Sequence, residues 1–470
     1  MANKGDWAEH EFRTLDLGDK RLDRRLTKVL GDLAASPLES IPTASEGWAE
    51  TQGAYRLFRN EKVTADKVLR PHTEETLRRM ANTPVALVLQ DTTELDYSAK
   101  QGKLKDAGPI NRETHVGMLL HPQIVVTPEG IHLGILDAEM WTRDAETLGQ
   151  HRDYAKRDFE EKETRRWRDG YRIAARAAEA CPQTQVISIG DREADMFELL
   201  LEAEKNSLKN MHFVVLARHN RCLAERDAAA GGAVHVKMYD RVAQQKPLGR
   251  VMIDIPRQKD RKARVAELEI RATQLEIKSP HIKNLPNVTV WCVHAKENDP
   301  PPGVEPVEWY LLTDLPCRTL EEAVAALQYY AMRWQIEVFF RVLKTGCKVE
   351  QLQFERLERL QPCLAVYMIA TWRILNVMML GRHCPDLPCD ILLTEAEWKS
   401  AWQVRRRTPP PESPPRLGEM ITILSSLGGH LGRKCDGPPG PKSIWIGLHR
   451  TMEFALAWNT FGPGADTGEP

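Results

Sequence analysis

The sequence lacks the marks of a secreted or disulfide-stabilised protein. Its nine cysteines are an odd number and include no CxxC pair, which argues against a disulfide framework and for a reducing compartment. The one tight cluster, HCPDLPC at residues 383–389, fits no common zinc-site spacing. No basic stretch followed by an apolar one opens the chain, so we expect no secretory signal and a cytoplasmic location.

The chain also lacks an uninterrupted long hydrophobic run. The most apolar stretch, CLAVYMIATWRILNVMML at 363–380, contains Arg373 near its middle. A charge at that depth in a bilayer is costly, so this stretch is predicted to be a buried helix.

Neither sign of charge dominates the composition. The 65 Lys and Arg residues are balanced by 66 Asp and Glu residues, for a net charge of -1, so nothing global favours nucleic-acid binding. Any such function must rest on local groups of basic residues. At 470 residues, with 42% apolar side chains, the chain is expected to form two or three globular domains.

Residues 1–80 are predicted to be helical. The segment 17–37 has Asp19 in position to cap a helix and apolar residues at helical spacing. Its other face carries four basic residues, at positions 21, 24, 25 and 28. By spacing alone, this basic face fits solvated surface as well as a binding surface. Further helices are expected over 46–60 and after Thr64.

The middle of the chain has the pattern of an α/β protein. VALVLQD at 85–91 and QVISIGD at 185–191 are short apolar runs typical of strands buried on both faces. Two strands around a turn are expected within 118–141, and a long charged helix within 158–180. This order predicts a mixed sheet covered by helices. A strand-rich part, 207–320, interrupts it and suggests an inserted β subdomain, after which the chain is again helical.

Two of the predicted buried strands end in an aspartate, Asp91 and Asp191. Ligands gather at the carboxyl ends of strands in open α/β sheets, so both carboxylates are candidates for cation binding. Asp also commonly begins a turn after a strand, and each aspartate taken alone fits that structural role.

The stretch YYAMRWQIEVFFRVLKTG, residues 329–346, offers a third carboxylate. As one helix it would place Tyr330, Arg333, Glu337 and Lys344 in a narrow stripe, with an apolar face opposite that packs on the sheet. Three carboxylates suit Mg²⁺ or Mn²⁺, and two such ions about 4 Å apart can serve phosphoryl transfer. Alternatively, Arg333 and Glu337 form an ordinary i,i+4 ion pair. The residues alone leave both interpretations open.

Several motifs in order resemble one family. Residues 330–344 match Y-x2-R-x3-E-x6-K without a gap, and the chain is similar here to DDE transposases of the bacterial insertion-sequence-four family, in the branch of the transposon-five transposase. The other matching segments are DTTELDY at 91–97, GDREAD at 190–195, SEGWAETQGAYRLFRN at 45–60, EWYLLT at 308–313 and SIWIGLHRTMEFALAW at 443–458.

The resemblance implies a fold: a ribonuclease-H-like catalytic core interrupted by an inserted β-strand subdomain, with N-terminal and C-terminal helical domains. The implied domains are a DNA-end-binding domain at 1–80, the first part of the core at 81–206, the β insertion at 207–320, core completion with the Glu337 helix at 321–380, a dimerisation region at 381–460 and a disordered tail at 461–470.

It also implies an activity. A cut-and-paste transposase of this kind binds the inverted-repeat ends of a mobile element as a homodimer, cleaves them with Mg²⁺ (two ions, replaceable by Mn²⁺) through a hairpin, and joins the 3′ ends to target DNA. The location implied is the nucleoid of a bacterial cell. The alternatives are a catalytically silent DNA-binding relic or repressor, and a ribonuclease-H-like nuclease that does not join ends.

The same resemblance assigns residues. Asp91, Asp191 and Glu337 correspond to the metal-binding catalytic triad, and Trp309 to an aromatic that receives a flipped base. The implied DNA contacts are Tyr330, Arg333, Lys344, Trp309, Arg21, Arg25 and Arg218. The sequence departs from the family pattern at Leu22, Leu216 and Asn220, so a different set of contacts to the element ends is expected.

Overall fold

The chain forms two compact units in the computed structural model. The first comprises residues 1–79, 92–149 and 337–470, and the second comprises residues 80–91 and 150–336. The residues that the structure describes are 7–35, 40–45, 47–100, 104–110, 115–144, 158–226, 234–255, 264–280, 285–433 and 436–462. The predicted disordered tail therefore lies, from residue 463 on, outside the described residues. The two units group the chain differently from the six domains predicted.

The first unit begins with the predicted helices. They are α1 (Trp7–Glu11), α2 (Lys20–Ala35), α3 (Ile41–Ala44), α4 (Trp48–Phe58) and α5 (Ala65–Ala81). Asp19 caps α2 as expected, because its Oδ1 accepts a hydrogen bond of 2.9 Å from the Arg21 amide. The apolar side of α2 is buried through Leu26, Leu30 and Leu33. The helical N-terminal segment and its cap are thus confirmed.

Four antiparallel strands follow in this unit. They are β2 (Thr93–Asp96), β3 (Gly108–Pro109), β4 (Val116–Val126) and β5 (His132–Trp141). Strand β4 pairs with β2, β3 and β5. The turn expected within 118–141 lies at TPEG, residues 127–130, and joins β4 to β5; there the Thr127 amide donates to the Ile131 carbonyl at 2.9 Å.

Helices make up the rest of the first unit. They are most of α11 (Trp334–Arg341), the π-helical η5 (Val342–Gly346), the 3₁₀ helices η6 (Val349–Gln351) and η7 (Cys389–Ile391), α12 (Leu357–His383), α13 (Glu395–Arg406), α14 (Leu417–Leu427) and α15 (Pro441–Phe461). By length and composition α12 alone, among the described helices, could span a membrane, but 83% of its most apolar window is buried in the protein. It packs against α2, α4, β5, α14 and α15, which confirms the predicted buried helix.

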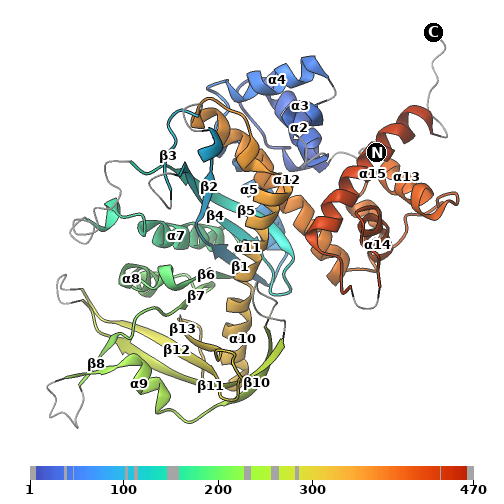
Figure 1. Cartoon of the computed structure of the whole chain (residues 1–470). Helices are drawn as coiled ribbons and strands as arrows, with labels where there is room; N and C mark the ends of the chain where they lie inside the picture. Colours follow the sequence, from blue (N-terminus) through green and yellow to red (C-terminus); the bar gives the residue numbers. More distant parts are fainter. Residues whose placement is uncertain are drawn as a thin grey trace. The chain divides into compact units, whose positions relative to one another are not determined.

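The second unit is built on a mixed sheet (Figure 1). Strands β1 (Val85–Gln90), β6 (Gln185–Gly190) and β7 (Met211–Leu216) are parallel neighbours in that order. Antiparallel strands continue the sheet: β13 (Glu308–Thr313), β12 (Val288–Glu297), β11 (Arg264–Ile277), β8 (Cys222–Arg226) and β9 (His235–Lys237), with β10 (Gly249–Ile255) also on β11. The strands of the predicted β insertion therefore continue the sheet that contains β1 and β6.

The helices of this unit pack on the sheet, as the predicted order requires. Helix α7 (Arg165–Ala180) contacts β1, β6 and β7, and α10 (Leu320–Ala331) contacts β6, β7 and β13. The others are the short η3 (Phe159–Glu161) and η4 (Arg192–Ala194), and α8 (Phe197–Lys205) and α9 (Met238–Ala243). A mixed α/β architecture is confirmed.

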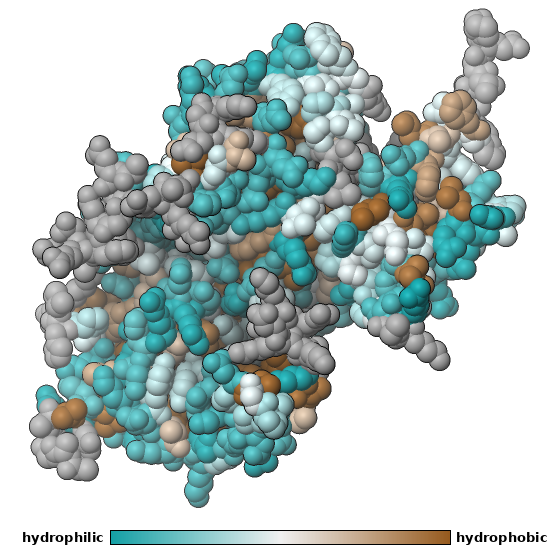
Figure 2. Space-filling view, viewed as in Figure 1, coloured by the Kyte–Doolittle hydropathy of each residue, from teal (hydrophilic) through white to brown (hydrophobic). Residues whose placement is uncertain are grey.

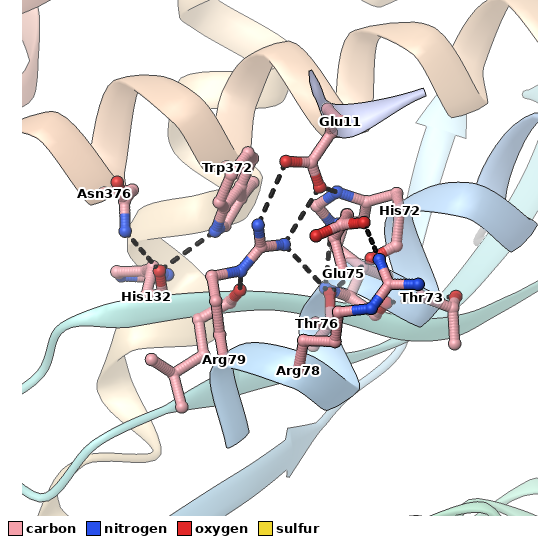
Figure 3. Close-up of polar contacts among 12 residues, drawn as sticks. Glu11, His72, Thr73, Glu75, Thr76, Arg78, Arg79, His132, Trp372 and Asn376 are labelled. Atoms are coloured by element: carbon pink, nitrogen blue, oxygen red, sulfur yellow. Dashed lines mark hydrogen bonds and ion pairs between the residues drawn. The ribbon is translucent and has the colours of Figure 1, made fainter. Parts of the chain in front are cut away.

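A buried polar network ties α1, α5, β5 and α12 together within the first unit (Figure 3). The Arg79 guanidinium donates to both carboxylate oxygens of Glu11, at 3.0 and 2.9 Å. It also lies 4.3 Å from the centroid of the Trp372 ring. The indole Nε1 of Trp372 donates to the His132 carbonyl at 2.9 Å. The N-terminal helix is therefore fixed to the long helix α12 by a paired charge and an aromatic ring.

His72 completes the network in a neutral form. Its Nε2 accepts a hydrogen bond of 3.0 Å from the Ile135 amide, so the ring proton is on Nδ1, which donates to Glu11 at 2.5 Å. Burial lowers the pKa of His72. Burial would raise the pKa of Glu11, but the hydrogen bonds from His72 and Arg79 and the charge of Arg79 outweigh it and lower that pKa. With His72 neutral, Arg79 supplies the compensating charge.

This network predicts acid sensitivity. The folded pKa values of His72 and Glu11 both lie below their ordinary values of 6.5 and 4.5, so the stability they contribute is present at higher pH. It is lost first as the pH falls below 6.5, and again below 4.5. Glu11→Gln should lower the free energy of unfolding by roughly 3 kcal/mol at pH 7.5, because it breaks a buried pair.

The measurement is urea unfolding between pH 3 and 8 for Glu11→Gln and a control. Glu74→Gln alters an exposed pair with Arg70 on α5, the helix that carries His72 and Arg79, and should change stability by about 0.5 kcal/mol or less. A wild-type pH profile for Glu11→Gln below pH 4.5 would contradict the assignment.

Candidate functional site

Two carboxylates lie next to each other at one edge of the sheet in the second unit. Strands β1 and β6 pair in parallel with Leu89 opposite Ile189, and each strand is followed at the same distance by its aspartate, Asp91 or Asp191. Neighbouring strands are about 4.8 Å apart. The parallel register therefore brings the two predicted strand-end aspartates to adjacent positions.

The turn after β6 fixes Asp191. Its Oδ1 accepts a hydrogen bond of 2.7 Å from the Glu193 amide and so caps η4. Gly190 permits this turn, because a Cβ there would lie 2.4 Å from the Cβ of Ala194. The glycine before the aspartate in GDREAD thus has a packing role.

Arg333 points at this edge. Its NH1 lies 3.2 Å from Oδ2 of Asp91, with both side chains about four-fifths buried. Its backbone amide donates to the Tyr330 carbonyl at 2.9 Å. The stripe predicted on the 329–346 segment therefore faces the strand ends at Arg333.

Tyr330 and Trp309 form an aromatic wall beside the carboxylates. Tyr330 is buried, and its ring meets that of Trp309 edge-on with centroids 5.7 Å apart. Burial raises the pKa of Tyr330, the guanidinium of Arg333 opposes the rise, and the charge of Asp191 adds to it. Asp91, Asp191, Trp309, Tyr330 and Arg333 are thus brought together in one unit.

The segment 329–346 is not the single α-helix predicted. Helix α10 ends at Ala331, and the amides of Met332 and Arg333 make i→i+3 bonds before α11 begins at Trp334. Beyond Arg341 the winding loosens into the π-helical η5. Tightened and widened turns of this kind occur at hinges and functional sites, and they change the angle between successive members of the stripe.

The apolar face of this segment is buried as predicted, at Ile336, Phe339, Val342 and Leu343. The packing partners of η5 differ from the prediction, because η5 contacts the helices α12 and α15. Gly346 lies under the indole of Trp445, where a Cβ would be 3.1 Å from the ring.

Lys344 lies in the first unit against β2, the strand of the DTTELDY motif. Its Nζ donates to the Glu94 carbonyl. Burial lowers the pKa of Lys344, while Glu350, Glu94 and Asp96 counteract the fall. The Glu350 carboxylate also accepts from the Asp96 amide at 3.0 Å, so η6 and β2 together hold this lysine.

Glu337 is on α11, four residues after Arg333, and is half-buried. Within the described parts of the chain, HCPDLPC included, no three His, Cys, Asp or Glu side chains are close enough together to hold a metal ion. The chemistry of the predicted donors still suits a hard cation, because two adjacent carboxylates need positive charge nearby. The Arg333 guanidinium supplies such a charge at Asp91.

Arg218 is exposed in the loop that follows β7. Strand β7 is parallel to β6, with Val215 opposite Gly190, so Arg218 emerges at the same edge as Asp191. Its amide donates to Asp195 at 2.7 Å. Asp195 belongs to the GDREAD motif, but reasoning from the sequence used only the first aspartate of that motif.

The predicted DNA contacts on α2 differ from each other. Arg21 is 89% exposed in its side chain and pairs only locally, with Asp19. Arg25 is held between helices, because its NH1 lies 2.5 Å from Oε2 of Glu50 and its guanidinium covers Gly53 on α4. Arg21 is thus displayed at the surface, whereas Arg25 also joins α2 to α4.

We expect this difference to be measurable as stability. Arg21→Ala should change the free energy of unfolding by less than about 0.5 kcal/mol. Arg25→Ala should lower it by about 1 kcal/mol, because an interhelical pair and its packing are lost. Urea denaturation of the two variants makes the comparison, and equal losses of stability would refute the structural role of Arg25.

Comparison with known families identifies both ends of the chain. Residues 4–63 match the transposase DNA-binding domain, which covers α1 to α4 and includes Arg21 and Arg25. Residues 368–459 match the Tn5 transposase dimerisation domain, which covers most of α12 and then α13 to α15.

The C-terminal helices have the surface that a dimerisation domain needs. Apolar side chains stay exposed there at Val404, Leu431, Leu456 and Phe461, and Figure 2 shows apolar atoms over this part of the chain. Leu456 is 61% exposed, whereas Trp445 and Leu448 on the same helix are buried.

These matches confirm the resemblance that the motifs predicted. A DNA-binding domain at one end and a Tn5-type dimerisation domain at the other support a Tn5-like transposase that binds DNA and forms homodimers.

Proposed function

We propose that the protein is a cut-and-paste transposase of the insertion-sequence-four family that cleaves the inverted-repeat ends of its element through a hairpin intermediate and joins the 3′ ends to target DNA. The observation that carries this proposal is the pair Asp91 and Asp191 at the ends of neighbouring parallel strands. The parallel strands β1, β6 and β7 also support a ribonuclease-H-like core.

The donor set favours Mg²⁺, with Mn²⁺ as a substitute. Asp91, Asp191 and Glu337 would hold the ions, since hard cations prefer carboxylate oxygens. When bound, the ions supply activation of the attacking oxygen and stabilisation of the leaving oxygen on phosphorus. In the protein without DNA or metal, the Arg333 guanidinium compensates the charge of Asp91. Where a cation compensates that charge instead, we expect the guanidinium to be available for a DNA phosphate.

The neighbouring side chains give the site its selectivity for a DNA strand. Arg333 can fork onto a phosphate. The Tyr330 hydroxyl can donate to another phosphate oxygen. Trp309, propped edge-on by Tyr330, offers a ring face on which a flipped base would stack, worth roughly 1 to 3 kcal/mol. These roles match a site that bends one strand back to form a hairpin.

Substrate selection is assigned to the N-terminal domain. Arg21, which is exposed, and Arg25 would contact the element end, and Lys344 would contact DNA near the cleaved end. Binding dominated by phosphate contacts depends steeply on salt. The nucleoid of a bacterial cell is the location that this substrate implies.

The test incubates the purified full-length protein with Mg²⁺ and a labelled DNA fragment carrying the inverted repeats of its element. Wild type should produce nicks at the element ends, then hairpins, then joined products. Glu337→Gln should abolish cleavage but leave end binding within about twofold, because the change removes a charge that DNA does not contact directly. Glu358→Gln, an exposed glutamate on α12, is the matched control and should cleave normally.

Three outcomes decide between functions. End binding without nicks by the wild type would favour a DNA-binding relic or repressor. Nicks without joined products would favour a nuclease. Normal cleavage by Glu337→Gln would remove Glu337 from the triad.

A further inference from the structure

The loop that joins β7 to β8 is held rigidly by its backbone. The Ala217 amide donates to the Tyr310 carbonyl at 2.7 Å, and the Arg221 carbonyl accepts from the Met238 amide at 2.9 Å. Between these anchors, the amides of Arg218 and His219 both donate to Oδ2 of Asp195, at 2.7 and 2.9 Å. The loop therefore has one defined backbone path, although the Arg218 side chain is exposed.

Asp195 is saturated by these contacts. Its Oδ1 accepts from Nε and NH2 of Arg221, at 3.0 and 2.6 Å. Its side chain is 0% exposed, and Arg221 is 14% exposed. Both carboxylate oxygens thus have two donors each, so Asp195 is not available as a fourth cation ligand beside Asp191.

The sheet places this loop between two parts of the proposed site. Strand β7 is parallel to β6 on one side, with Val215 opposite Gly190, and antiparallel to β13 on the other, with Leu216 opposite Leu311. The end of β7 therefore lies between the start of η4 and the start of β13. Along this edge, Asp191 comes from β6, Arg218 follows β7, and Trp309 begins β13.

We infer that Asp195 is a positioning residue that acts through Arg218. It holds the loop so that the Arg218 guanidinium meets the DNA phosphate lying between the carboxylates and the base that stacks on Trp309. This inference rests on the proposed function of the site and adds to it a residue that does not touch the substrate.

The physical reason is preorganisation. An arginine on a mobile loop must lose conformational freedom when it grips a phosphate, and that loss weakens the contact. Two amide hydrogen bonds to one buried, charge-compensated carboxylate remove most of the backbone freedom before DNA binds. Small displacements of such groups cost large factors in rate.

The test is a double-mutant cycle on end cleavage with Asp195→Asn and Arg218→Ala. Asparagine keeps the shape of the Asp195 side chain. Its NH₂ group, however, replaces one carboxylate oxygen and faces N–H donors, either the two loop amides or Arg221. Each single variant should slow hairpin formation by about tenfold or more, and the double variant should be no more than about twofold slower than the slower single variant, because both changes remove one contact. Amide hydrogen exchange should also rise at Arg218 and His219 in Asp195→Asn alone.

A matched control is available at the other end of the same strand. Asp314 accepts from the Phe213 amide at 2.9 Å and from His212 at 3.0 Å, away from the proposed site. Asp314→Asn should lower the melting temperature about as much as Asp195→Asn does. Its effect on the rate of hairpin formation should, however, be independent of Arg218→Ala, so that the two effects multiply. Thermal melts of all variants confirm that each is folded.

The outcomes separate this inference from the proposed function. If the wild type forms hairpins but the effects of Asp195→Asn and Arg218→Ala multiply, Asp195 does not act through Arg218. If the wild type binds the element ends without cleaving them, the proposed function fails. The double-mutant cycle is then measured on the affinity for the element end. There, equal reductions in the salt dependence by Asp195→Asn and Arg218→Ala support the positioning role, and unequal ones overturn it.

Discussion

The parallel pairing of β1 with β6 is the constraint on which the candidate site depends. Both strands are buried, apolar and nearly equal in length, and their register places Leu89 opposite Ile189. Because parallel strands end at the same edge, the carboxylates that follow them, Asp91 and Asp191, are forced into adjacent positions. Two adjacent negative charges are unfavourable without compensation, and the surrounding residues are arranged to provide it.

That compensation explains the rest of the edge. Arg333 lies against Asp91, and Asp191 accepts an amide hydrogen bond from η4. The break between α10 and α11 brings Arg333 to this place directly after Tyr330, which backs Trp309. Carboxylates, a guanidinium and aromatic rings thus lie together at a single sheet edge, as the proposed function requires.

Much of this arrangement was predictable because it is local. Apolar runs ending in Asp predict buried strands with carboxylates at their ends, and helical spacing predicts the buried face of Ile336 and Phe339. The winding of 329–346 was not predictable. The shift to a π-helical turn at 342–346 coincides with packing against distant residues, such as Trp445 over Gly346.

Long-range pairing accounts for the other differences. The strands of 207–320 alternate as an independent β subdomain would, and only the pairing of β7 with β13 shows that they extend the first sheet. Nothing in the sequence around Asp195 indicates its contacts. Its carboxylate accepts from the amides of Arg218 and His219, which are more than twenty residues away along the chain. Membership in a buried network such as Glu11, His72 and Arg79 is set by tertiary contacts in the same way.

The central claim is that Asp91 and Asp191 form a divalent-cation site at the strand ends, with Arg333 as the group that the cation displaces. Its most direct test is the Mn²⁺ affinity of the protein bound to its element end, measured by titration with the electron paramagnetic resonance signal of free Mn²⁺. The account predicts weaker Mn²⁺ binding in Asp191→Asn and, in the absence of DNA, tighter binding in Arg333→Ala than in wild type. Unchanged Mn²⁺ affinity in Asp191→Asn would contradict it.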